Sequence, residues 1–174
     1  PSREVMQLLL DSRADVNQMG REGMPPLVHA VFQQQVDSAR LLLSAGADVN
    51  VLCRPPSPSL TALIQAACTG NVELVDVLLE ANAEVNAKCD GNALSFAAEN
   101  GHEDCVAALI EAKGDVGDRN SHGATPLHLA ALRGQIACMR LLIAAGSGLE
   151  DENDCYFRRQ RPLHLASKDG FSEC

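Results

Sequence analysis

Cysteine and histidine carry the reactive chemistry of this sequence, because both bind metals and both can act in covalent or acid–base catalysis. No two cysteines form a C-x-x-C pair, and no histidine lies at a zinc-like distance from such a pair. The sequence therefore predicts no metal site. An odd number of thiols without a pairing pattern fits reduced cysteines in an intracellular compartment. The seven cysteines are Cys53, Cys68, Cys89, Cys105, Cys138, Cys155 and Cys174.

No catalytic set is indicated by the remaining polar residues. The sequence ties no serine or cysteine nucleophile to a histidine and a carboxylate. The acidic pairs Glu103-Asp104 and Asp151-Glu152 are typical of solvated turns. The stretch "GSG" at 146–148 predicts a helix stop, since no strand and Gly-rich loop surround it. We expect no catalysis and no cofactor. The five histidines are His29, His102, His122, His128 and His164.

The elements that would position these residues are short helices. At 123–147, Thr125 is a suitable N-cap and Pro126 a suitable first helical residue, so one helix should start there and end at Gly134. A second should run over 136–144 and stop at Gly146. Isolated helices shorter than about 12 residues are marginal in water, so this pair must bury its apolar face elsewhere.

The same helix pair recurs along the chain. A leucine followed seven residues later by a turn residue appears five times, at steps of 36, 31, 33 and 36 residues. A small residue follows each of the first four leucines after 20 residues, whereas the connections to the next leucine vary. Constant packing units with variable loops predict a stacked repeat array. The leucines are Leu27, Leu63, Leu94, Leu127 and Leu163, and the turn residues are Gln34, Gly70, Gly101, Gly134 and Gly170.

A period near 33 residues with "TPLHLAA", a turn glycine and "LLIAAG" resembles the ankyrin repeat. The resemblance covers essentially the whole chain. It implies an all-α repeat solenoid of antiparallel helix pairs with β-hairpin-type loops, about four complete repeats plus partial terminal repeats, and a concave binding face. We expect one array over 1–174, with a partial repeat at 1–17, repeats at 18–50, 51–86, 87–117 and 118–150, and a truncated repeat at 151–174.

Departures from the repeat pattern carry local predictions. Asn92 should still cap its helix, whereas Pro25 and Arg161 should not, which predicts looser starts there. The connection before Leu94 is two residues shorter than the 13-residue spacing, so we expect a shortened hairpin. Cys105 and Cys138 share one repeat position and should be small core residues. The resemblance implies structural roles for three histidines: His102, His128 and His164.

Composition limits the classes of partner. A net charge of −9 argues against general nucleic-acid binding. No apolar run approaches the ~18 residues of a membrane span, and no signal peptide starts the chain, so we expect an intracellular, cytoplasmic protein without membrane insertion. The ends do not resemble polar capping repeats, so we expect a fragment of a longer protein. We expect no small-molecule substrate.

Recognition of a protein partner is the function that the resemblance implies. Ankyrin-like arrays bind through hairpin tips and the exposed part of each first helix. In the long loop 151–161, aromatic and arginine residues are typical of binding hot spots, although they could instead pack on the array and pair with nearby acidic residues. The candidate partner-binding residues are Phe32, Gln33, Thr69, Glu99, Asn100, His122, Leu132, Arg133, Tyr156, Phe157, Arg158, Arg159 and Lys168.

Two alternatives to a stand-alone adaptor remain open at this stage. The array could be the targeting arm of an enzyme or ion channel whose other parts lie outside this sequence. It could also be a substrate, because Asn17, Asn50 and Asn86 resemble the ankyrin sites of asparaginyl hydroxylase. Each of them ends a "VN" turn with a leucine eight residues earlier. They could equally stabilise the turn.

Overall fold

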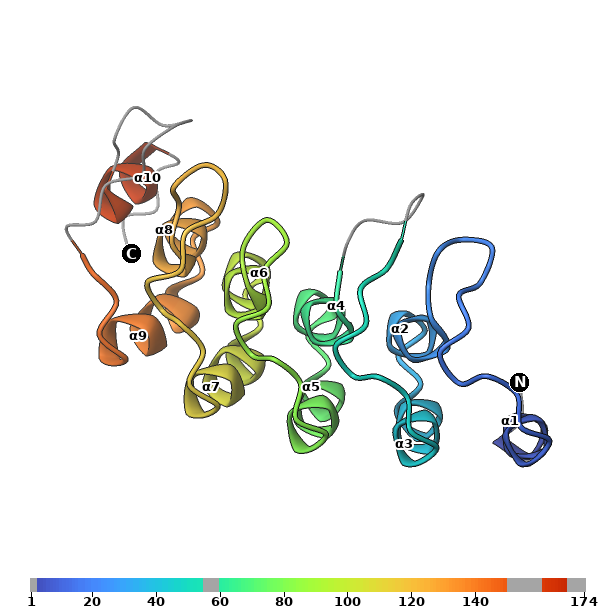
Figure 1. Ribbon diagram of the computed structural model, residues 1–174. Helices are drawn as coiled ribbons and strands as arrows, with labels where there is room; N and C mark the ends of the chain where they lie inside the picture. The colour runs from blue at the N-terminus through green and yellow to red at the C-terminus, as the bar shows by residue number, and fades with distance from the viewer. Residues whose placement is uncertain (1–2, 55–59, 150–160, 169–174) are drawn as a thin grey trace. The chain divides into compact units, whose positions relative to one another are not determined.

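The computed structural model describes residues 3–54, 60–149 and 161–168, apart from the side chains of residues 167 and 168. The described residues form ten helices joined by loops and contain no strand, which confirms the predicted all-α repeat fold. Figure 1 shows the helices as successive pairs. The chain divides into two compact units, residues 1–84 and 85–174, and each is described by itself.

The first unit holds two complete helix pairs and one further helix. Within it, α2 pairs with α3 and α4 pairs with α5. The pairs then stack, α2 on α4 and α3 on α5, and α1 packs on α3. The helices are α1 (Arg3–Asp11), α2 (Pro26–Phe32), α3 (Val36–Ser44), α4 (Ala62–Thr69) and α5 (Val72–Glu80).

The second unit repeats this arrangement. The helix α6 pairs with α7 and α8 pairs with α9, while α6 stacks on α8 and α7 on α9. The last described helix, α10, packs on α8. We call the first helix of each pair, and α10, first-type helices, and the second helix of each pair a second-type helix. The pair predicted over 125–144 is thereby confirmed. The helices are α6 (Ala93–Asn100), α7 (Glu103–Glu111), α8 (Pro126–Leu132), α9 (Ile136–Ala144) and α10 (Pro162–Lys168).

Side-chain caps fix where the first helix of a pair begins. The Asn92 side chain accepts a hydrogen bond from the Ser95 amide at 2.9 Å, as predicted for a helix without the usual threonine. In α8, Thr125 caps the helix and His128 returns a bond to the Thr125 amide, which makes a capping box. Pro25 precedes α2 and makes no side-chain cap bond, also as predicted.

Residues with positive φ end the first helices. Gly70, Gly101 and Gly134 have φ of 76°, 78° and 66°, a left-handed conformation that costs glycine little. Gln34 takes the same turn with φ of 54°, although a β-carbon makes this conformation unfavourable. The turn geometry is therefore kept in all four repeats, and one of them keeps it with some strain.

The core of each unit consists of small aliphatic residues on facing helices. Four of the five periodic leucines are buried, with 1% exposure or less, whereas Leu163 in α10 is 75% exposed. Among the described residues, α10 lacks the second helix that covers the equivalent leucine elsewhere. In the second unit the core residues are Ala93, Leu94, Ala97, Ala98, Cys105, Val106, Leu109, Leu127, Ala130, Ala131, Cys138, Leu142, Leu165 and Ala166.

Candidate functional site

The second unit contains a pocket between the two first-type helices α6 and α8. Its volume is about 320 Å³, at the small end of the range of ligand pockets, so its chemistry rather than its size must decide its role. Two helices supply its walls, and the loops before them supply its rim. The lining residues are Asp90, Ser95, Phe96, Glu99, Asn120, His122, Ala124, Leu129 and Leu132. We call this the α6–α8 pocket.

Hydrogen bonds between neighbouring loops hold the rim of the α6–α8 pocket. The Ser121 amide donates to Asp90 Oδ1 at 2.9 Å, which joins the loop before α6 to the loop before α8. Asn120 Oδ1 accepts from the amides of His122 at 3.0 Å and Ala124 at 2.9 Å, which closes the second loop on itself. The rim is therefore held by backbone amides that donate to two short side chains, those of Asp90 and Asn120.

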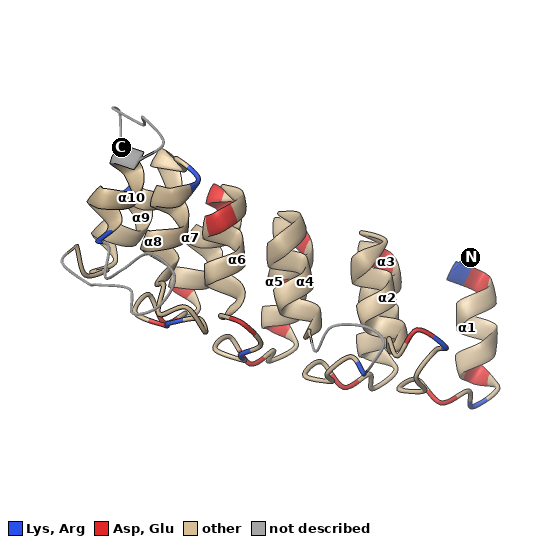
Figure 2. Cartoon of the chain, turned by 90° about the horizontal axis from the view of Figure 1, so that it is seen from above, with Lys and Arg blue, Asp and Glu red and all other residues tan. Residues whose placement is uncertain are grey.

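An ion pair between a buried carboxylate and an exposed lysine joins the same two loops. The Asp118 side chain is fully buried and pairs with Lys88, whose own side chain is 61% exposed. The hydrogen bond to Asp118 is the main reason that the pKa of Lys88 is raised above its ordinary value. Figure 2 shows acidic and basic residues interspersed in the loops that join the helices.

The charges at the pocket are mainly negative. Hydrogen bonding from the Ser121 amide holds the pKa of Asp90 below its ordinary value, so this carboxylate is ionised at neutral pH. Glu99 on α6 is bonded to Arg133, with Oε1 to Nη2 at 2.8 Å. Asp90 makes no ion pair with lysine or arginine within the described part of the chain.

The structure brings together several of the residues predicted to bind a partner. Glu99, His122 and Leu132 line the α6–α8 pocket, and Arg133 adjoins it through Glu99. Asn100 ends α6, where its Nδ2 donates to the Phe96 carbonyl at 2.9 Å. The second unit thus gathers five of the predicted residues around one pocket or its bordering helix.

The other predicted residues do not join this site. Phe32 and Gln33 are exposed at the end of α2 in the first unit. The Thr69 hydroxyl bonds to carbonyl groups of its own helix, at 3.1 Å to Ala66. Tyr156, Phe157, Arg158 and Arg159 lie outside the described residues, as does the side chain of Lys168.

Sequence reasoning missed most of the pocket wall. Asp90, Ser95, Phe96, Asn120 and Leu129 were not among the predicted binding residues, although they line the pocket. Two signals in the sequence could have found them. The connection before Leu94 is shortened, and the position of the "TPLH" histidine holds a serine in this repeat.

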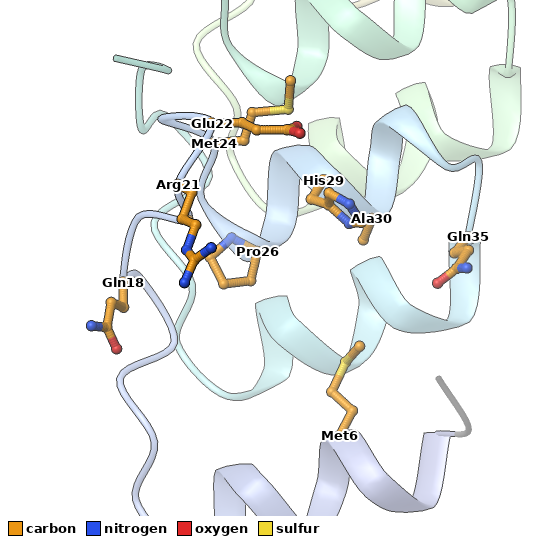
Figure 3. A pocket seen from close by; sticks show the side chains of 10 residues that line it. Met6, Gln18, Arg21, Glu22, Met24, Pro26, His29, Ala30 and Gln35 are labelled. Carbon is orange, nitrogen blue, oxygen red and sulfur yellow. The ribbon is translucent and has the colours of Figure 1, made fainter. Parts of the chain in front are cut away.

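A second pocket, of about 450 Å³, lies in the first unit between α1 and α2. Figure 3 shows Met6 rising from α1, with His29 and Ala30 on α2. Arg21 and Glu22 come from the loop before α2. Residues of α1, α2 and the neighbouring loops line it, whereas α6, α8 and the loops before them line the α6–α8 pocket.

Several cysteine and histidine side chains that could react or bind metals are instead buried in the core or in a helix cap. Cys105 and Cys138 are buried in the core, as predicted. Burial is the main cause that raises the pKa of the Cys138 thiol, and the same holds for Cys53, which disfavours a thiolate at neutral pH. His128 is fully buried in its capping box, which agrees with a structural role.

The three asparagines considered as hydroxylation sites join successive repeats. Asn17 Oδ1 accepts from the Asp48 amide at 2.9 Å, and Asn50 Oδ1 from the Glu84 amide at 2.7 Å. In the second unit, Asn86 Oδ1 accepts from the Asp115 amide at 2.8 Å. These hydrogen bonds give the three asparagine side chains a structural role. Hydroxylation of the three asparagines stays a prediction.

The comparisons with known proteins agree with this geometry. The family model described as "Ankyrin repeats (3 copies)" matches residues 52–120 and 94–174, and the model "Ankyrin repeat" matches residues 22–54. The chain belongs to the ankyrin-repeat family. Within the described residues, no helix is long and apolar enough to cross a membrane.

Similar proteins are much longer than this chain. It is 42% identical over 85 residues to the Ankyrin repeat and KH domain-containing protein mask of Drosophila melanogaster, covering 49% of this chain and 2% of that protein. It is 31% identical over 151 residues to mask-1 of Caenorhabditis elegans, covering 84% and 6%. The Probable E3 ubiquitin-protein ligase XBOS32 of Oryza sativa subsp. japonica is 29% identical over 158 residues, covering 71% and 31%. The chain thus spans less than a third of each of these relatives.

Proposed function

We propose that the chain is a protein-interaction scaffold that binds a partner protein at the α6–α8 pocket and at the loops and first helices around it. The observation that carries the proposal is the pocket itself, where apolar walls and polar groups from two successive repeats converge. Membership of the ankyrin-repeat family supports a binding role.

The proposal assigns no catalysis to the chain. The buried histidine takes part in a helix cap, and the buried cysteines pack in the core. Structural roles account for both kinds of side chain. The net charge of −9 and the carboxylates at the pocket favour a protein partner over a nucleic acid.

A second candidate is favoured by the lengths of the relatives. The chain matches 6% of mask-1 and 31% of the probable ubiquitin ligase, so an ankyrin array of this kind occurs within larger proteins. In this version the same pocket recruits a partner or substrate for an activity located elsewhere in a longer protein.

Site-specific photo-cross-linking tests the proposed site. A benzophenone amino acid replaces His122 or Arg133 beside the pocket, and matched variants carry it at Glu111 on α7 or Arg140 on α9, which are exposed on second-type helices. After incubation with cell lysate, we expect covalent protein adducts from the first two variants. Adducts from Glu111 and Arg140 alone would place binding on the opposite helices and refute the proposal.

A further inference from the structure

The wall of the α6–α8 pocket recedes at Ser95. Ser95 is the third residue of α6, and His128 is the third residue of α8. The His128 ring folds back on its cap, with Nδ1 3.2 Å from the Thr125 amide nitrogen. Serine lacks the ring that would occupy this space, and the buried Ser95 Oγ has no hydrogen-bond partner within the described residues.

The short loop before α6 closes tightly on this serine. Gly91 has φ of 108°, and a β-carbon there would lie 3.1 Å from Ser95 Cβ. A residue larger than glycine would therefore crowd the loop against α6. The neighbouring residue, Asp90, lines the pocket.

The pocket combines an apolar wall with an acidic rim. Phe96, Leu129 and Leu132 supply apolar surface, whereas Asp90 and Glu99 supply carboxylates. Arg133 already neutralises Glu99, but Asp90 accepts its hydrogen bonds from Ser121. A carboxylate has about four lone-pair sites, so Asp90 retains capacity for a further donor.

We propose that the α6–α8 pocket receives the side chain of an arginine from an extended segment of the partner protein. The aliphatic stem of arginine suits the apolar wall, and its guanidinium can donate to Asp90 while lying over the ring of Phe96. An acidic side chain would meet like charge at the rim. This inference rests on the proposed function, because it names the group that the same pocket recognises.

Peptide selection tests the inference on the full chain. A library of displayed linear 12-residue peptides is selected for binding, and we expect the enriched peptides to share an arginine. Replacing that arginine by citrulline, which keeps its shape and removes its charge, should weaken binding about tenfold or more. The Asp90→Asn variant should lose most of this preference, and Ser95→His should bind weakly because its ring fills the pocket.

Matched controls separate recognition from folding. Asp104→Asn removes one exposed carboxylate from α7, outside the pocket, and should leave the arginine preference unchanged. Circular dichroism and the urea midpoint verify that each variant is folded. Enrichment of peptides without arginine, equal binding of citrulline peptides, an unaltered preference in Asp90→Asn, or no enrichment at all would each overturn the inference. Cross-links at the pocket combined with such a result would leave the proposed function standing.

Discussion

The helices α6 and α8 begin at equivalent positions in successive repeats, but different residues cap their N-termini. In α8, Thr125 and His128 form a buried capping box. In α6, Asn92 supplies the cap alone, and Ser95 has no ring at the position that His128 holds in α8. The same helix start therefore accepts either a serine or a histidine at its third position. This is possible because leucine and alanine residues form the core of both repeats.

The largest effect should come from the shared core. Leu94→Ala and Leu127→Ala each remove a fully buried side chain and should each lower the free energy of unfolding by about 2–5 kcal/mol. Leu163→Ala is the matched control, since this leucine is 75% exposed and should change stability by less than about 0.5 kcal/mol. Urea denaturation measures all three. A much smaller loss for Leu94→Ala than for Leu127→Ala would show that the open wall weakens the core beneath it.

Exchanging the residues at the third position of α6 and of α8 should have unequal results. His128→Ser removes a capping-box bond and leaves a cavity, so it should cost about 1–2 kcal/mol. Ser95→His should cost less, because the pocket offers space for the ring. Thermal unfolding of both variants tests this order, and a larger loss for Ser95→His would mean that the pocket cannot accept a ring.

Replacing the turn residue after the first helix of a repeat should change the free energy of unfolding by a smaller amount and in the opposite direction. Gln34 has φ of 54° where the other repeats have glycine. Gln34→Gly should therefore stabilise the chain by up to about 1 kcal/mol, because glycine adopts this conformation at little steric cost. Gly134→Gln in the second unit is the reciprocal variant and should destabilise. An unchanged urea midpoint in both variants would contradict the strain assigned to Gln34.

The smallest effect concerns the pH dependence of Asp90. Its pKa is lower in the folded chain than the ordinary value of 3.8, mainly because of the bond from the Ser121 amide. Its contribution to stability is therefore present above pH 3.8 and is lost as the pH falls through the folded pKa. The urea midpoint of Asp90→Asn should lie slightly below that of the unmodified chain at pH 6, and the gap should narrow as the pH falls below 3.8. A constant gap over this range would argue against the contribution.

Much of the fold could be predicted from local sequence because each element is short and periodic. Thr125, Asn92 and the turn glycines predicted where helices start and stop, and the leucine spacing predicted which residues are buried. The burial of Leu27, Leu63, Leu94 and Leu127 follows directly from that spacing. Leu163 shares the spacing, but its exposure depends on which neighbours are present, and no local pattern states this.

The candidate site was less predictable because it depends on groups from two repeats. Glu99, His122 and Leu132 could be chosen from their repeat positions, and they do line one pocket. The bond between Asp90 and Ser121 joins residues 31 apart, and the approach of Gly91 to Ser95 depends on the conformation of a shortened loop. These contacts follow from loop geometry, which periodicity leaves undetermined.

Hydrogen–deuterium exchange of the full chain, with and without a bound partner or selected peptide, tests the central claim most directly. The account predicts slower exchange at residues 88–100 and 118–133, the segments that form the α6–α8 pocket. Protection confined to α7 and α9, with these segments unchanged, would contradict the claim that the pocket is where the partner binds.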